Sequence, residues 1–333
     1  MHAALRRGRL AGSPVDRMLI PIALSLTLAL AGCVGGTTPA ATAGSAASAT
    51  PAPAWPLTLT DDEGNVVELK TEPRRIVSLT PATTEIAFAL GAGARVVATT
   101  DFDDYPPEVR SLPHVATFSS VDVEKIIGLD ADLVLAGGNS FNSPEALDRL
   151  RTLGMPVLAV YAPTVGAVLS DIELVGRAIG RADEAKALVG SMRGQIDSVS
   201  AATADLPHPR TFYELDATKD IFGPADDSFV AEMVRLAGGT PITTGSTTVF
   251  SIPLEKLVAA DPEVIVLGDA NYGATPEIVA GRPGWGGIAA VRSAAIRPVD
   301  DVVVTRPGPR LPAGLRSLAL AIHPDLSLPP VPS

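Results

Sequence analysis

The sequence predicts an α/β protein with two lobes, each built on a mostly parallel sheet, joined by a single long helix. Three observations support this prediction: strand and helix patterns alternate along the chain, one strand–helix segment occurs twice, and an extended helical pattern lies between its two copies. Alternating strands and helices are typical of parallel sheets covered on both faces. The 333 residues also suit two lobes better than one small domain.

The repeated segment comprises residues 122–138 and 253–269. Each copy predicts a short helix that begins with Glu-Lys, an aspartate at its end, and a buried strand that ends in glycine. The likeness continues past the strand, where Phe141 corresponds to Tyr272. Each lobe therefore offers one aromatic side chain in the same loop.

Residues 164–206, between the two copies, predict two consecutive helices. Apolar residues recur at steps of three and four over 168–179 and again over 185–199. Gly180 can end the first helix in a left-handed turn. The second helix would be about 30 Å long, which is enough to connect two lobes.

The N-terminal residues carry the pattern of an export signal. Four arginines precede an apolar run over residues 18–30, and small residues follow it. This pattern is that of a secretory signal, and the run is too short to span a membrane. Leu-Ala-Gly-Cys33 resembles a bacterial lipobox, which implies cleavage before Cys33 and a lipid on its sulfur. We expect a signal peptide over 1–32 and a lipidated, disordered tether over 33–56, which is rich in small residues and proline.

The remaining chain divides into an N-terminal lobe over residues 57–163 and a C-terminal lobe over 207–326. Removal of residues 1–32 takes away four arginines and one aspartate, which changes the formal net charge from −11 to −14. So acidic a protein disfavours binding to nucleic acid or to anionic lipid surfaces. We therefore expect the lipid, and not the charge of the protein, to hold it at the outer face of the cell membrane. We also expect the protein to be a monomer.

The sequence lacks the familiar catalytic patterns. It contains no G-x-S-x-G elbow, no Walker A motif and no G-x-G-x-x-G after a predicted strand. The histidines after residue 32 also lack the spacing of zinc or manganese ligands. We predict that the chain is not an enzyme and holds no metal or cofactor of its own. An exported α/β enzyme and a purely structural surface lipoprotein are the alternatives from other classes.

Aromatic residues gather in the predicted connections and at strand ends. Open parallel sheets bind ligands beyond the carboxyl ends of their strands. Because aromatics make up only 4% of the chain, this distribution suggests a cleft for a large, flat or partly apolar ligand. Any one of these rings could instead pack on its own lobe. The candidate ligand-binding residues are Phe102, Tyr105, Phe118, Phe141, Tyr213, Phe250, Tyr272 and Arg306.

Several segments resemble the substrate-binding proteins of ABC importers for cobalamin, iron–siderophore chelates and haem. They are residues 75–86, 104–107, 123–126, 132–135 and 306–310. The resemblance extends over about residues 57–324. It implies two Rossmann-like lobes joined by one long helix, with a metal chelate bound between them as the ligand. It also implies an ABC permease and its ATPase subunits as partners.

The resemblance further implies roles for individual residues. Phe102 and Phe118 fall where cobalamin binders carry aromatics, and Arg306 falls on a ligand-contacting arginine. The glutamate on each lobe that docks arginines of the permease matches Glu124 and Glu255, which correspond to each other in the internal repeat. We therefore predict a lipid-anchored receptor that delivers cobalamin, another corrinoid or an iron–siderophore to an importer. A haem receptor of the same family is the nearest alternative.

Overall fold

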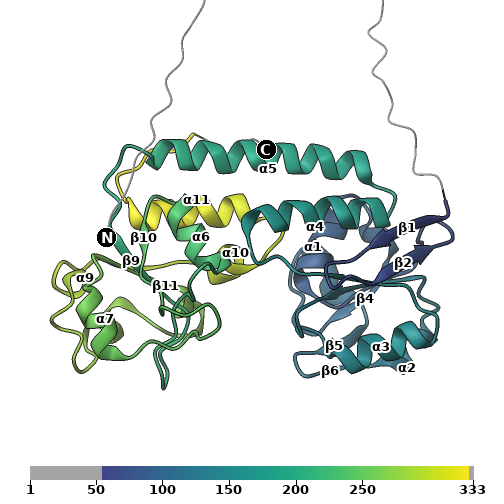
Figure 1. Ribbon diagram of the computed structural model, residues 1–333, viewed down its shortest axis with the longest axis horizontal. Helices are drawn as coiled ribbons and strands as arrows, with labels where there is room; N and C mark the ends of the chain where they lie inside the picture. Colours follow the sequence, from purple (N-terminus) through teal and green to yellow (C-terminus); the bar gives the residue numbers. More distant parts are fainter. Residues whose placement is uncertain (1–54, 330–333) are drawn as a thin grey trace, which may run out of the picture. The chain divides into compact units, whose positions relative to one another are not determined.

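Two mostly parallel sheets form the framework of the protein, in agreement with the predicted α/β class. The structure, a computed structural model, describes residues 55–329; the predicted signal peptide and Cys33 lie outside this range. One sheet has six strands in the order β6-β5-β4-β3-β7-β8, and the other has four in the order β10-β9-β11-β12 (Figure 1). A separate antiparallel hairpin pairs β1 (Leu57–Thr60) with β2 (Val66–Leu69).

The six-stranded sheet comes from the first half of the chain. Its neighbouring strands pair in parallel, except that β6 is antiparallel to β5. The strands are β3 (Ile76–Ser78), β4 (Val96–Thr100), β5 (His114–Thr117), β6 (Ser120–Val121), β7 (Leu133–Gly137) and β8 (Val157–Val160).

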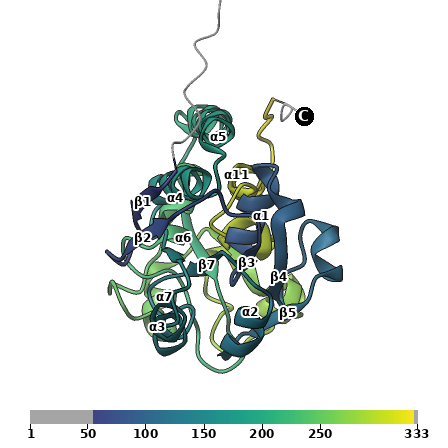
Figure 2. The same ribbon diagram turned by 90° about the vertical axis from the view of Figure 1, so that its right-hand side faces the viewer.

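Helices cover both faces of this sheet. Strand β7 shows how the sequence divides them, because successive side chains on a strand point to opposite faces. Leu133 and Leu135 pack in the same apolar cluster as α1 and α4, whereas Val134 and Ala136 pack with α2 and α3. Figure 2 shows α1 and α4 above the strands and α2 and α3 below them. The helices are α1 (Pro81–Ala89), α2 (Val123–Gly128), α3 (Pro144–Thr152) and α4 (Val165–Ala178), with short 3₁₀ turns at η1 (Gly93–Arg95) and η2 (Pro107–Ser111).

The two helices predicted between the repeats are α4 and α5 (Ala182–Thr203). Thr164 caps α4 by accepting a hydrogen bond from the Ala167 backbone N–H, and Gly180 takes a left-handed φ of +69° between the helices. The chain leaves the first sheet at β8 and enters the second at β9, so α4 and α5 form the connection. Helix α5 packs along α4 and along α11 (Leu311–Ile322) (Figure 1).

The four-stranded sheet is entirely parallel. Its strands are β9 (Arg210–Glu214), β10 (Thr240–Pro241), β11 (Val264–Leu267) and β12 (Ile296–Pro298). The remaining helices are α6 (Phe229–Leu236), α7 (Leu254–Ala260), η3 (Gly268–Tyr272), α8 (Pro276–Ala280), α9 (Ala289–Arg292) and α10 (Asp301–Thr305). No helix within residues 55–329 is both long and apolar enough to cross a bilayer.

The internal repeat is visible in the backbone as well as in the sequence. Asp130 and Asp261, which end the two repeated helices, both adopt a left-handed φ, of 49° and 45°. Each copy also ties its strand to the preceding part of its lobe through an acidic side chain. Asp132 accepts a hydrogen bond from the Arg75 backbone N–H, and Glu263 accepts one from that of Arg210. Each lobe therefore contains one copy of the same helix–strand unit.

Candidate functional site

Three phenylalanines form a cluster beyond the carboxyl ends of the first sheet. Phe102 follows β4, Phe118 follows β5 and Phe141 follows β7, so three different strands contribute one ring each. The ring centroid of Phe102 lies 6.4 Å from that of Phe118 and 6.4 Å from that of Phe141. Phe118 is 86% exposed and Phe141 49% exposed. Such exposure of neighbouring rings is unfavourable in water and is typical of surfaces that bind another molecule.

The loop that carries Phe141 is held by buried polar contacts. The Asn142 side chain accepts a hydrogen bond from the Gly137 backbone N–H at 2.8 Å and donates one to the Leu79 carbonyl at 3.1 Å. Gly137 must lack a side chain here, since a Cβ would lie 2.8 Å from Thr80 Cγ2 and 2.9 Å from Phe141 Cδ1. The ring of Phe141 therefore occupies the space that a larger residue at position 137 would need.

Arg306 lies at the centre of an ion-pair network. Its Nη1 donates to Glu85 Oε1 at 2.8 Å and to Asp104 Oδ1 at 2.7 Å. Arg310 adds two hydrogen bonds to the same Glu85 carboxylate, at 2.8 and 2.6 Å. The guanidinium of Arg310 also lies 4.3 Å from the ring centroid of Tyr105, a favourable cation–π distance.

The sequence indicated Arg306 and Tyr105 but missed Glu85 and Arg310. Burial alone would lower the pKa of Arg306, but the hydrogen bonds to Asp104 and Glu85 raise it above its ordinary value, so the guanidinium stays charged. The available signal for Arg310 was its place with Arg306 in the same Arg-Pro-Gly-Pro-Arg segment, residues 306–310. Nothing in the sequence pattern pointed to Glu85 as their partner.

The aromatic residues predicted in the second lobe divide into two kinds. Tyr272, at the end of η3, is 80% exposed, and Phe250 is 43% exposed in the loop before α7. Tyr213 is fully buried, and its hydroxyl donates to Asp301 at 2.8 Å. The expectation that Tyr213 offers a ring to a ligand is therefore wrong in this structure, because the face of β9 to which it points is covered by helices. Tyr213 instead supports α10 through its hydrogen bond to Asp301.

A cavity of about 310 Å³ opens next to Tyr272. It lies where β9 and β11 end, and its charged lining residues are Asp216, Asp269 and Arg282. Arg282 donates to both carboxylate oxygens of the buried Glu214, at 2.5 and 2.9 Å. None of these charged residues is among those that the sequence pattern predicts for the site.

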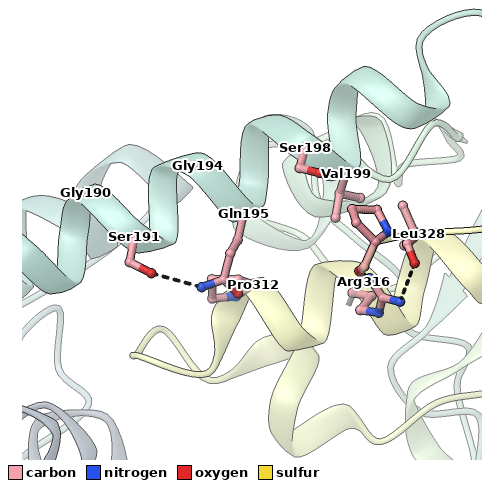
Figure 3. Close-up of a pocket in the computed structure, with 10 residues that line it drawn as sticks. Gly190, Ser191, Gly194, Gln195, Ser198, Val199, Pro312, Arg316 and Leu328 are labelled. Atoms are coloured by element: carbon pink, nitrogen blue, oxygen red, sulfur yellow. Dashed lines mark hydrogen bonds between the residues drawn. The ribbon is translucent and has the colours of Figure 1, made fainter. Parts of the chain in front are cut away.

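A second cavity, of about 410 Å³, lies away from the strand ends, between α5, α11 and residues 328–329. Figure 3 shows Gln195 donating to Ser191 along α5, and Arg316 reaching the Leu328 carbonyl. No predicted site residue lines this cavity. It therefore belongs to the packing of the connecting helix rather than to the site at the strand ends.

The two glutamates predicted to dock a permease are both exposed. Glu124 lies in the first turn of α2, where its side chain is 88% exposed and 3.7 Å from that of Arg149. Glu255 lies in the first turn of α7, the corresponding helix of the second lobe, and is exposed as well. Among residues 55–329, no group of three or more His, Cys, Asp or Glu side chains could hold a metal ion.

Comparison with known proteins places these features in a family. A family model described as "Periplasmic binding protein" matches residues 76–302. The chain is 36% identical over 276 residues to an uncharacterized ABC transporter substrate-binding lipoprotein, YvrC, of Bacillus subtilis, a match that covers 81% of this chain and 87% of that protein.

Solved structures agree with this match. The periplasmic vitamin B12-binding protein BtuF of Vibrio cholerae has a TM-score of 0.66 and 25% identity, covering 75% of this chain and 97% of that one. The periplasmic haem-binding protein RhuT of Roseiflexus sp. RS-1 has a TM-score of 0.66 and 26% identity, covering 75% and 98%. The fold, the paired repeat units and these matches together show that the chain belongs to the periplasmic binding protein family.

Proposed function

We propose that this protein is the substrate-binding component of an ABC importer and that it captures a metal chelate, either a corrinoid or an iron–siderophore. The observation that carries the proposal is the cluster of the half-buried Phe102 with the exposed Phe118 and Phe141, whose rings offer an apolar platform at the strand ends. A corrin or similar macrocycle has a broad face that can cover such a platform. The similarity to a vitamin B12-binding protein supports this ligand class.

A haem receptor is the second candidate, favoured by the similarity to RhuT. Haem iron in proteins is held by an axial side chain such as His, Cys, Met or Tyr. Within residues 55–329, the exposed tyrosines Tyr105, Tyr161 and Tyr272, in the connections after strands, could supply one. Tyr161, which follows β8, was not among the residues predicted from the sequence.

The site supports binding rather than catalysis. The relatives whose names describe an activity are binding proteins, and the strand ends carry aromatic rings and ion-paired charges. We infer that the chain acts with a permease and ATPase subunits, because a substrate-binding component has no transport activity of its own. Glu124 and Glu255, one on each repeated helix, are the proposed contacts with the permease.

We also propose that Cys33 carries a lipid that anchors the mature protein outside the cytoplasm. The name of the Bacillus subtilis relative, a lipoprotein, supports this proposal. Cell fractionation of a Cys33→Ala variant tests it, since the variant should leave the membrane fraction with its ligand affinity unchanged. Retention of the variant in the membrane fraction would exclude the lipid anchor.

The proposed ligand class is tested by purifying the whole chain and recording the absorption spectrum and mass of any molecule that co-purifies. The protein freed of that molecule is then titrated with a corrinoid, a ferric siderophore and haem. Saturable binding of one of these chelates supports the proposal and identifies the class. Failure of all three to bind would remove the proposed function.

A further inference from the structure

The loop that carries Phe141 begins with a tight turn over residues 138–141. The Phe141 backbone N–H donates to the Gly138 carbonyl at 3.1 Å and closes the turn. Its two central residues, Asn139 and Ser140, both have left-handed φ values, of 52° and 63°. A turn of this kind favours glycine, asparagine or aspartate at both central positions. Asn139 meets this preference and Ser140 does not, so the turn depends on contacts with its surroundings.

One such contact comes from the β1–β2 hairpin. Glu63, in the turn between these two strands, accepts a hydrogen bond from the Asn139 backbone N–H at its Oε1, at 3.1 Å. The hydrogen bond that closes a β-turn uses the N–H of the fourth residue, so the N–H of the second residue is free for this outside partner. The stem of Glu63 also packs on the turn, because a Cβ added to Gly138 would lie 3.3 Å from Glu63 Cγ. The hairpin therefore holds the first half of the turn.

The Glu63 carboxylate is itself held in place. The buried Asp61 accepts the backbone N–H of Glu63 at 3.1 Å through Oδ1 and that of Ala159, on β8, at 3.3 Å through Oδ2. The hairpin turn is thus tied to the first sheet. Arg151, on α3, lies with its Nη2 3.6 Å from Glu63 Oε2. These contacts orient the carboxylate toward residues 138–141.

We propose that Glu63 is a positioning residue of the ligand site, which fixes the turn over residues 138–141 and so holds the ring of Phe141 beside that of Phe102. Phe141 is the last residue of the turn, so the turn sets the direction in which its side chain leaves the backbone. A ring that is already in place loses less conformational freedom when a ligand covers it, which favours binding. The inference rests on the proposed function, because it assumes that a chelate covers the phenylalanine cluster. Glu63 itself precedes residues 76–302, the segment that the family model matches.

The first measurement follows the turn directly, by NMR relaxation of the backbone amides in the whole chain. Order parameters of residues 139–141 should be near the value of about 0.85 that rigid backbone shows, and they should fall toward about 0.6 in Glu63→Ala. Glu63→Gln keeps an acceptor oxygen at the same position and should show the wild-type values. Glu63→Asp keeps the charge but shortens the side chain, so it should behave like Glu63→Ala.

The second measurement asks whether Glu63 acts through Phe141. Calorimetric titrations of the whole chain use cyanocobalamin, ferrichrome and haem as probes, and the variants are titrated with the probe that wild type binds. Glu63→Ala should weaken binding about two- to tenfold, and Glu63→Gln should remain close to wild type. In a Phe141→Ala background, Glu63→Ala should weaken binding by no more than about a further 1.5-fold, since Glu63 has nothing to position once the ring is gone.

Glu68→Ala is the matched control, because it removes an exposed acid from β2 of the same hairpin. It should leave both the order parameters and the affinity unchanged.

Wild-type order parameters in both Glu63→Ala and Glu63→Asp would overturn this inference, and so would a loss of affinity that is the same with and without the Phe141 ring. Either result would leave the proposed function standing, since wild type would still bind its probe. Failure of wild type to bind any of the three probes is a failure of the proposed function, and the inference about the ligand site falls with it. If Glu63→Ala does not fold, the comparison of Glu63→Asp with Glu63→Gln decides the question by the same measurements.

Discussion

Arg306 Nη1 lies 2.8 Å from Oε1 of Glu85, although the two residues are 221 positions apart in the sequence. The Glu85 carboxylate belongs to α1 and is almost fully buried. Arg310 binds the same carboxylate from the start of α11, so two arginines of the second half of the chain converge on one acid of the first. Asp104, in the loop that follows Phe102, is the second acceptor for Arg306. The segment between α10 and α11 is thereby fixed to the strand ends of the first sheet.

Removal of the Glu85 charge should destabilise the protein. Glu85→Gln removes the buried carboxylate that Arg306 and Arg310 share and leaves Arg306 with Asp104 alone. Loss of one partner of a buried ion pair costs about 2 to 4 kcal/mol of unfolding free energy. Urea denaturation of the whole chain measures this change.

Glu184→Gln is the matched control, because Glu184 pairs with Arg181 on the surface of α5. Exposed pairs contribute about 0 to 1 kcal/mol, so this variant should unfold close to wild type. If Glu85→Gln unfolds at the same urea concentration as the control, the network does not hold the two segments together.

Phe118 and Tyr213 should respond in opposite ways to substitution. Phe118→Ala removes an exposed ring, so it should change stability by less than about 0.5 kcal/mol while weakening chelate binding by about 1 to 3 kcal/mol. Tyr213→Phe keeps the buried ring and loses the hydrogen bond to Asp301, which should cost about 1 kcal/mol of stability with little change in affinity. Calorimetric titration and urea denaturation of both variants separate the two effects, and the reverse pattern would place Tyr213 in the site.

The free energy of unfolding should change with pH because of Asp171, a buried residue of α4. Burial and the neighbouring Asp62 raise the pKa of Asp171 to about 8, well above its value of about 3.9 in an unfolded chain. Between these values the folded state binds the extra proton, so this residue's contribution to stability is present at low pH and is lost as pH rises through about 8.

Asp171→Asn should remove that pH dependence. Relative to wild type, the variant should gain stability, by a few kcal/mol, as pH rises from about 5 to about 9. Urea midpoints at several pH values test this expectation, with Asp183→Asn on the surface of α5 as the control. Parallel pH profiles for wild type and Asp171→Asn would show that Asp171 is ionised throughout this range.

Glu124 and Glu255 should matter for transport and not for binding. Both carboxylates are exposed, in the first turns of corresponding helices, so they can meet positively charged pockets on a permease. The double change to alanine should abolish stimulation of the transporter ATPase and uptake into cells, with chelate affinity nearly unchanged. Asp325→Ala, which removes an exposed acid of the same lobe as Glu255, is the control for overall charge. Normal delivery of the chelate by the double variant would show that the two glutamates do not dock the permease and interact only with the dipoles of their own helices.

Local patterns predicted the elements well because each depends on neighbouring residues. The steps of three and four over residues 168–179 and 185–199 correspond to buried faces of α4 and α5, and Gly180 takes the left-handed turn expected of it. The rule that parallel sheets bind ligands at the carboxyl ends of their strands also predicts that Phe102, Phe118 and Phe141 lie at one edge of the sheet, and their rings are neighbours in the structure.

The pairing of distant charges could not be predicted in the same way. Glu85 and Arg306 meet only because the two halves of the chain fold against each other, and no spacing rule reaches across that distance. The burial of Tyr213, in contrast, follows from a local feature of the sequence. Phe212 and Tyr213 are adjacent on β9, so they point to opposite faces of a sheet that is covered on both sides, and both must be buried.

The most direct test of the central claim is a calorimetric titration of the whole chain, freed of bound ligand, with a corrinoid, a ferric siderophore and haem. The same titrations are made on a variant with Phe102, Phe118 and Phe141 all changed to alanine. We predict that wild type binds one of these chelates with a Kd of about 1 μM or below and that the variant, although folded, binds it at least about a hundredfold more weakly. Equal affinities for wild type and the triple variant, or no binding of any chelate by wild type, would contradict the claim that this cluster is the site of a chelate receptor.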